Sequence, residues 1–171
     1  MTNAFDEAVD RAADAIRGPA MDRVMYTLSS AADHSILWFA IGGLKGVAAR
    51  DPRYVAKFAT VMGLESALTN GLLKGIVGRT RPTHEITEGP LPYGMRRPIT
   101  SSFPSGHATA AFTAASILAA TGRGSLRWYV LAGVVASTRV YTKMHHASDV
   151  LAGAALGLAM GHAARHWFTR S

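Results

Sequence analysis

The chain has 171 residues, of which 49% are hydrophobic and 17% charged, and its mean hydropathy is +0.13. Soluble domains usually carry roughly 25% charged residues, so this composition favours a membrane-associated protein, and the length suits one domain over residues 1–171. With no cysteine, the chain has no disulfide, no thiolate metal site and no cysteine nucleophile.

The formal net charge of +7 is compatible with binding to nucleic acid. However, the Lys and Arg residues are scattered between apolar segments, and the aromatic residues do not interleave with a basic stripe. Contact with anionic lipid headgroups explains the same charge. We therefore expect a bilayer as a partner and no nucleic acid.

Residues 1–30 form an N-terminal arm that begins with an amphipathic pattern. Apolar Phe5, Val9 and Ile16 recur at helical spacing opposite acidic side chains, and Gly18-Pro19 then interrupts the pattern. Such a helix either lies on the membrane surface or caps a helical bundle through the same apolar face.

Five apolar segments follow, each bounded by charged residues, Gly or Pro. None offers 18 uninterrupted apolar residues, so a buried soluble helical bundle stays open as an alternative. Gly153, Gly157 and Gly161 favour spanning, because small residues at four-residue intervals let membrane helices pack closely. We expect an all-α, multi-pass membrane helical bundle of about five spans plus the N-terminal amphipathic helix. The segments cover residues 36–49, 54–77, 108–121, 126–140 and 150–168.

Three polar clusters stand where apolar segments meet loops. With five spans, the ends of the second and fourth segments and the starts of the third and fifth fall on one membrane face. The clusters are therefore predicted to converge there. They read KGIVGRTRP (74–82), SFPSGHA (102–108) and STRVYTKMHHASD (137–149).

The first cluster contains Lys74 and Arg81, seven residues apart. This spacing is close to two helical turns, so both cations share one side if the helix continues that far. An ammonium and a planar guanidinium suit phosphate oxygens. The alternative is that Lys74, Arg79 and Arg81 only reach toward an anionic membrane surface.

The second cluster predicts the start of a helix. Pro104 ends the loop, Ser105 is a preferred N-cap residue, and free backbone N–H groups at such a start bind anions. Gly106 lets the backbone approach a phosphate closely, and His107 can protonate a leaving oxygen. The alternative is a capping Ser-Gly pair followed by a surface histidine.

The third cluster places Arg139 six residues before His145 and Asp149 four residues after it, with Ser148 as a suitable helix cap. A carboxylate near the imidazole can keep one ring nitrogen protonated and aim the other at phosphorus as a nucleophile. Metal binding by His145, His146 and Asp149 is the alternative, although the other histidines lack ligand spacing.

In this order, the clusters resemble the three signatures of the type 2 phosphatidic acid phosphatase superfamily, which also includes bacterial acid phosphatases and vanadium haloperoxidases. The resemblance covers residues 74–149. The stretches 31–35 and 96–108 also look like actinobacterial phosphatase domains that act on polyprenyl-phosphosugars or are fused to lipid kinases. The first signature is met by Lys74, Arg81 and Pro82, the second by Pro104 to His107, and the third by Arg139, His145 and Asp149.

The third signature departs from the family pattern at a few positions. Thr138 replaces the usual Ser and keeps a hydroxyl, which leaves catalysis intact. Lys143 stands where many members carry Gly, and His146-Ala147 stands where many carry Tyr-Pro. Because these neighbours line the entrance in the family fold, the departures put substrate preference in doubt.

The resemblance implies a phosphatase mechanism without a metal or other cofactor. His145, oriented by Asp149, attacks phosphorus while His107 protonates the departing alkoxide, and water then cleaves the phosphohistidine. Because His145 must be neutral and His107 protonated, a bell-shaped pH profile is expected. The phosphate-binding residues implied by the signatures are Lys74, Arg81, Ser105, Gly106 and Arg139.

The substrate implied by the resemblance is the phosphomonoester or diphosphate of a membrane lipid: phosphatidic acid, phosphatidylglycerol phosphate, polyprenyl diphosphate or a polyprenyl phosphosugar. A vanadate-dependent haloperoxidase, a non-catalytic lipid-phosphate binder and a soluble acid phosphatase remain alternatives. By the positive-inside rule, the active site lies on the extracytoplasmic face of the cytoplasmic membrane. The cations of the opposite face are Arg50, Arg53, Lys57, Arg123, Arg127, Arg165 and Arg170.

Overall fold

The computed structural model describes residues 3–82, 93, 98, 100–122 and 124–169, and every regular element among them is a helix. This agrees with the all-α fold class predicted from the sequence. The elements are α1 (Ala4–Ala15), α2 (Pro19–Ala31), η1 (Asp33–Ser35), α3 (Ile36–Ala48), α4 (Pro52–Ser66), η2 (Ala67–Leu73), α5 (Lys74–Ile76), α7 (Gly106–Ala120), α8 (Ser125–Tyr141) and α9 (Ala147–Thr169).

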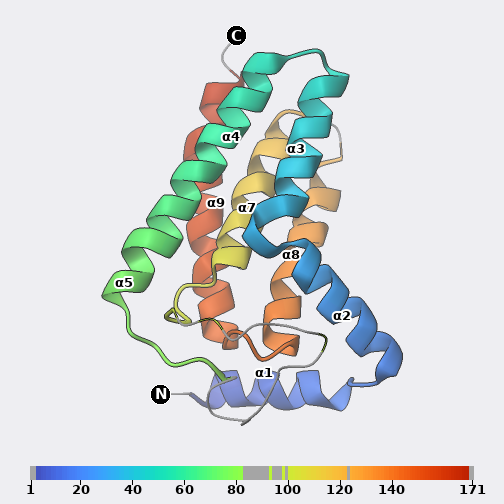
Figure 1. The fold of residues 1–171 in the computed structure, drawn as a ribbon, viewed down its shortest axis with the longest axis vertical. Coiled ribbons are helices and arrows are strands. Elements are labelled where there is room, and N and C mark those ends of the chain that lie inside the picture. Colours follow the sequence, from blue (N-terminus) through green and yellow to red (C-terminus); the bar gives the residue numbers. More distant parts are fainter. Residues whose placement is uncertain (1–2, 83–92, 94–97, 99, 123, 170–171) are drawn as a thin grey trace.

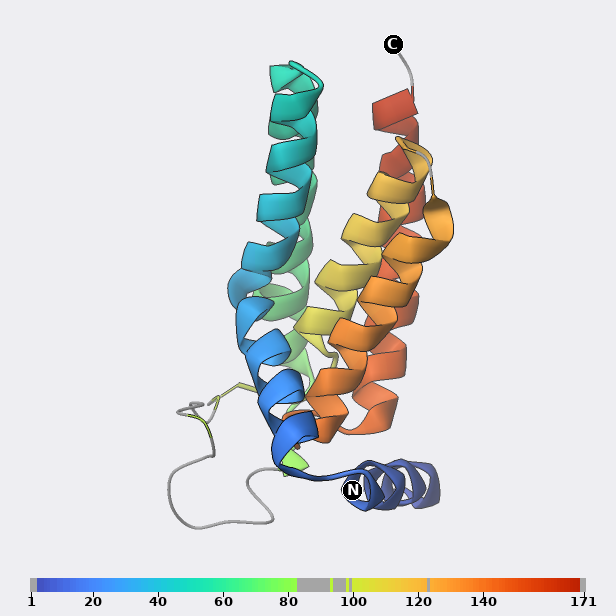
Figure 2. The same cartoon turned by 90° about the vertical axis from the view of Figure 1, so that its right-hand side faces the viewer.

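Five long helices, α3, α4, α7, α8 and α9, run lengthwise side by side, and α1 lies across one end of them (Figures 1 and 2). The chain alternates direction from one long helix to the next. The ends of α5 and α8 and the starts of α7 and α9 therefore lie at the same end of the bundle (Figure 1). This is the end that α1 covers.

The N-terminal arm folds as two helices. The Asn3 side chain caps α1 by accepting a hydrogen bond from the Asp6 amide at 2.8 Å. Gly18 then separates the helices, and Pro19 begins α2 at the position where a missing N–H costs nothing. The apolar face of α1 is directed at α8 and α9, as expected for a helix that caps the bundle.

Helix α7 lies in the core, because its Ala-rich sequence lets neighbouring helices approach on several sides. Its closest neighbour is α9, whose glycines face it. A Cβ on Gly153 would lie 2.5 Å from the Ser105 carbonyl oxygen, and one on Gly157 would overlap the Thr109 carbonyl oxygen. The glycines at four-residue intervals therefore form the packing face predicted for them.

The five apolar segments of the sequence coincide with helices of the structure, except that residues 49, 77 and 121 lie one residue beyond the helix ends. Among the described helices, none combines the length and the hydropathy needed to cross a membrane. The number of spans stays a prediction.

Candidate active site

The structure brings the three polar clusters together at one end of the bundle. The first and third clusters meet where Arg81 Nη1 donates to the Met144 carbonyl at 2.8 Å. The second and third meet where the Ser105 amide donates to the Asp149 carbonyl at 3.0 Å. Backbone and side-chain hydrogen bonds thus connect segments that lie far apart in sequence.

The first and second clusters also touch. A Cβ on Gly106 would lie 2.7 Å from Oδ1 of Asn70, and the same oxygen accepts a hydrogen bond from Lys74 Nζ at 2.7 Å. Glycine at position 106 therefore allows α7 to begin beside the side chain that holds Lys74. The Lys74 ammonium lies near the start of α7, where backbone N–H groups are exposed for an anion.

The helix that carries Lys74 does not continue to Arg81, so the expectation that both cations share one helical face is wrong. The backbone turns extended at Val77, and Arg81 lies in the loop that follows. Flanking glycines at positions 75 and 78 weaken the helix there. Before that point, the π-helical η2 changes the helical register, with the Lys74 amide bonded to the Thr69 carbonyl.

His145 is buried in the turn between α8 and α9, and its tautomer follows from its neighbours. Nδ1 lies 2.7 Å from the Ser102 carbonyl oxygen, which can only accept, so Nδ1 carries the proton. Nε2 is then unprotonated, and its lone pair accepts a hydrogen bond from Nη1 of Arg81 at 3.2 Å. Burial lowers the pKa of His145 to about 3, assisted by the charge of Arg81, so the ring is neutral above that pH.

Asp149 is fully buried, and its closest partners are not on His145. Oδ2 accepts the His146 amide at 2.9 Å and lies 3.8 Å from His145 Nδ1, while Oδ1 accepts from Arg79 at 2.6 Å. Burial raises the pKa of the Asp149 carboxyl, but the neighbouring His145 ring, the His146 hydrogen bond and the charge of Arg79 lower it below its ordinary value. Asp149 thus acts on His145 as a charge, while the Ser102 carbonyl makes the direct hydrogen bond.

The expectation that Ser148 caps the last helix is wrong. Helix α9 begins one residue earlier, at Ala147, and the Asp149 side chain bonds the amide of His146 just before it. This is the carboxylate half of a capping box. The Ser148 hydroxyl is directed elsewhere and donates to Asp6 at 2.8 Å.

His107 lies in the first turn of α7 and pairs with a carboxylate from η1. Its Nε2 is 2.9 Å from Oδ1 of Asp33. Burial lowers the pKa of His107 to about 4, with Arg139 adding to the effect, whereas Asp33 raises it. The Asp33 carboxylate therefore favours the protonated ring that a general acid requires.

Two donors in the site are buried and have no hydrogen-bond partner among the described residues. One is the Ser105 hydroxyl, which occupies the N-cap position of α7 without capping it. The other is Nε of Arg139, whose Nη1 donates to the Ser29 hydroxyl at 2.6 Å. Buried polar groups are nearly always paired, so these two donors indicate a site built for an anion.

Arg81 is almost fully buried, and loop carbonyls hold its guanidinium. It donates to the carbonyl oxygens of Thr100 and Ser101, both at 3.0 Å, as well as to Met144 and His145. Burial lowers the pKa of Arg81 to about 10, well above neutral pH, so the side chain stays charged. Arg81 lies next to Nε2 of His145. Its positive charge would therefore face the oxygens of a phosphate group that His145 attacks.

Among the described residues, no group of three or more His, Cys, Asp or Glu side chains gathers as metal ligands do. The described geometry provides an imidazole with an unprotonated Nε2, a second imidazole paired to a carboxylate, and several cations around them. This set is suited to attack on a phosphate group.

The profile of the PAP2 superfamily matches residues 54–171. The chain belongs to this superfamily. It is 31% identical over 143 residues to a decaprenylphosphoryl-5-phosphoribose phosphatase from Mycobacterium tuberculosis, an alignment that covers 84% of this chain and 78% of the relative. The PAP2 relatives are phosphatases, and this chain is a phosphatase.

Two solved PAP2 structures share the fold. A transmembrane phosphatidylglycerolphosphate phosphatase from Bacillus subtilis superposes with a TM-score of 0.75 at 26% identity, over 98% of this chain and 87% of the other. LpxE from Aquifex aeolicus superposes with a TM-score of 0.77 at 22% identity, over 95% of each chain.

Beyond the three PAP2 signatures, the structure adds side chains that the sequence analysis did not select. Asp33 pairs with His107, while Asp6 and Arg79 form a buried ion pair at 2.7 Å beside Asp149. The signal for Asp33 was the position of a carboxylate shortly before the first apolar segment, which begins at residue 36. Asp6 carried no signal of its own, because it resembles the other acidic residues of an amphipathic helix.

Proposed function

We propose that this PAP2 phosphatase removes phosphate from a membrane lipid through a phosphohistidine on His145, without a metal ion. The observation that carries the proposal is the hydrogen bond from Nδ1 of His145 to the Ser102 carbonyl. This bond leaves Nε2 unprotonated beside Arg81, in a site with buried, unpaired donors on Ser105 and Arg139.

In the first step, Nε2 of His145 attacks phosphorus, and the bond from phosphorus to the lipid oxygen breaks. His107 gives its proton to that oxygen, so that the lipid leaves as an alcohol. Lys74, Arg81, Arg139, the Ser105 hydroxyl and the Gly106 amide stabilise the charge on the other phosphate oxygens. Asp149 stabilises the imidazolium that forms.

In the second step, water attacks the phosphohistidine, and the bond from phosphorus to nitrogen breaks. His107, now neutral, accepts a proton from the water. Inorganic phosphate leaves, and both histidines return to their starting protonation states. Each step uses groups that this chain supplies.

Two comparisons support a lipid substrate. The Mycobacterium tuberculosis relative acts, by its name, on a decaprenyl-linked phosphoribose, and the Bacillus subtilis enzyme acts on phosphatidylglycerol phosphate. Both of these substrates carry the phosphate on a polar headgroup that is attached to an apolar tail. We propose a polyprenyl phosphosugar as the first substrate to test, with an active site on the extracytoplasmic face of the cytoplasmic membrane.

The test is phosphate release by detergent-purified protein, in EDTA, from polyprenyl phosphosugar, phosphatidylglycerol phosphate, phosphatidic acid, polyprenyl diphosphate and a soluble aryl phosphate. We expect release from at least one lipid, and a loss of at least about 1,000-fold in His145→Ala. His162→Ala is the matched control, because His162 is exposed further along α9. Tight vanadate binding without phosphate release from any lipid would instead indicate a haloperoxidase or a binder.

A further inference from the structure

We infer that helix α1 is a working part of the active site, in which Asp6 is a positioning residue that holds Asp149 and the His145 turn through Arg79 and Ser148. This inference rests on the proposed function, in which Asp149 and His145 carry the reaction. It assigns a role to an N-terminal helix that lies outside all three signature clusters.

Asp6 is the one fully buried residue of α1. Its Oδ1 accepts the Ser148 amide at 2.8 Å, and its Oδ2 accepts the Ser148 hydroxyl at 2.8 Å and Arg79 Nη2 at 2.7 Å. Burial of a carboxylate is costly unless hydrogen bonds and an opposite charge compensate it. All of these partners lie beside the catalytic residues, so the carboxylate is stable only when α1 is seated at the active site.

Arg79 joins Asp6 to the catalytic carboxylate. Its Nη2 donates to Asp6, while its Nη1 donates to Asp149 at 2.6 Å and to the Ser148 hydroxyl at 2.8 Å. One guanidinium thus connects two fully buried carboxylates by charge-assisted hydrogen bonds. Loss of the Asp6 charge would remove one of the two carboxylates that fix Arg79 and would allow Arg79 and Asp149 to shift together.

A second set of contacts connects α1 to the other side of His145. Lys143 has a left-handed backbone, with φ of 57°, and its Nζ lies 3.0 Å from Asp14 and 3.3 Å from Asp10. Arg17 donates to the carbonyl oxygen of Tyr141. The turn that carries His145 is therefore held on both sides: α1 contacts Lys143 and Ser148, and Arg17, just after α1, contacts Tyr141.

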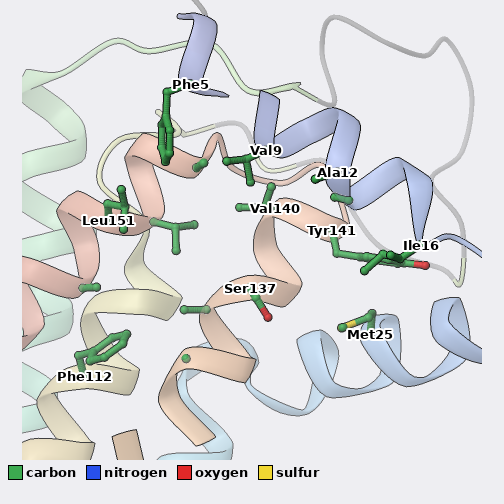
Figure 3. Close-up of a pocket in the computed structure, with 16 residues that line it drawn as sticks. Phe5, Val9, Ala12, Ile16, Met25, Phe112, Ser137, Val140, Tyr141 and Leu151 are labelled. Atoms are coloured by element: carbon green, nitrogen blue, oxygen red, sulfur yellow. The ribbon is translucent and has the colours of Figure 1, made fainter. Parts of the chain in front are cut away.

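The apolar contacts of α1 are looser than its polar ones. A pocket of about 470 Å³ lies between the apolar face of α1 and helices α8 and α9. Figure 3 shows Phe5 and Val9 of α1, and Ile16 directly after it, facing this space opposite Val140 and Leu151. Apolar side chains separated by such a space fix the position of α1 only weakly. The buried hydrogen bonds of Asp6 therefore determine where α1 lies on the bundle.

The experiment compares Asp6→Asn with Glu7→Gln in the full chain. Asn has the same shape as Asp but lacks the charge, while Glu7 is the exposed neighbour, whose partner Arg11 lies 3.9 Å away. We expect Asp6→Asn to lower kcat roughly 10- to 100-fold and to change KM less than about 2-fold, because the phosphate-binding donors are untouched. Glu7→Gln should match the wild type in both constants.

Hydrogen exchange of residues 142–150 provides a readout that does not depend on activity. Asp6→Asn should accelerate exchange there, whereas Glu7→Gln should not. If Asp6→Asn does not fold, Ser148→Ala replaces it: this change removes the hydroxyl contacts to Asp6 and Arg79, and we expect the same pattern with a smaller fall in kcat.

The outcomes separate the two proposals. If the wild type releases phosphate and His145→Ala does not, but a folded Asp6→Asn keeps its kcat and its exchange rates, the role of Asp6 is refuted while the proposed function stands. If the wild type releases no phosphate, the proposed function fails. The exchange comparison then decides by itself whether Asp6 holds the turn.

Discussion

The proposed mechanism gives His145 and His107 opposite tasks, and their surroundings differ accordingly. Burial keeps the His145 ring neutral, with a pKa of about 3, and the hydrogen bond from Nδ1 to the Ser102 carbonyl determines which nitrogen carries the proton. His107 has a carboxylate partner in Asp33, which raises the pKa of His107. Burial lowers this pKa by more, and the result in the free protein is a pKa of about 4. A bound phosphate adds negative charge and raises the His107 pKa further.

The pH dependence of kcat follows from the directions of these pKa shifts. In the proposed mechanism protonated His107 is the acid, so kcat should fall as pH rises through the His107 pKa of the substrate complex. Asp33→Asn removes a charge that raises this pKa, so the falling limb should move to lower pH by about one unit. Steady-state kinetics from pH 4 to 9 measure the shift.

Asp51→Asn is the matched control for this substitution. Asp51 caps α4 at the opposite end of the bundle, and Asn caps a helix equally well. Its pH profile should match that of the wild type. A falling limb that stays in place or moves upward in Asp33→Asn would remove Asp33 from the mechanism.

Helices α7 and α9 form the scaffold on which the second and third signatures meet. Gly157 faces the Thr109 carbonyl oxygen so closely that a Cβ has no room. Gly157→Ala should therefore force the helices apart and cost about 1–3 kcal/mol of stability. For a chain of this size, this corresponds to a fall in Tm of roughly 2–12 °C, which thermal unfolding in detergent would measure.

Gly133→Ala provides the comparison on α8. A Cβ at this helical position meets nothing within 4 Å, and alanine favours the helix, so Tm should stay the same or rise. Equal effects of the two substitutions on Tm would contradict close packing of α7 on α9.

At the scale of the whole molecule, one end of the bundle carries the site and the other carries Arg53. Because the chain has no cysteine, single cysteines report accessibility without a background. With the proposed orientation, an impermeant maleimide should label Glu7→Cys in intact cells, and Arg53→Cys only after permeabilisation. Both positions are exposed. The reverse pattern of labelling would place the active site in the cytoplasm.

Much of this architecture could be predicted from local patterns. Apolar segments separated by Gly, Pro and charge predicted the helices, and the alternation of their direction predicted that the three clusters gather at one end. Lys74, Ser105, His107 and His145 all lie in those clusters. Helical periodicity and breakers act within a few residues, so a single sequence carries them fully.

The individual contacts between segments far apart in the chain could not be predicted from the sequence. Asp6 meets Ser148 across 142 residues, and Asp33 meets His107 across 74. The Ser102 carbonyl, which sets the tautomer of His145, is a backbone group that every residue carries.

By itself, the sequence determined the helices, the superfamily signatures and the end of the bundle where they gather, because these depend on residue type and spacing. Only the tertiary structure decided which nitrogen of His145 carries the proton, which carboxylate pairs with His107, and which residues of the active site α1 contacts. The physical reason is that a hydrogen bond depends on a few tenths of an ångström between groups that are brought together only when the helices pack.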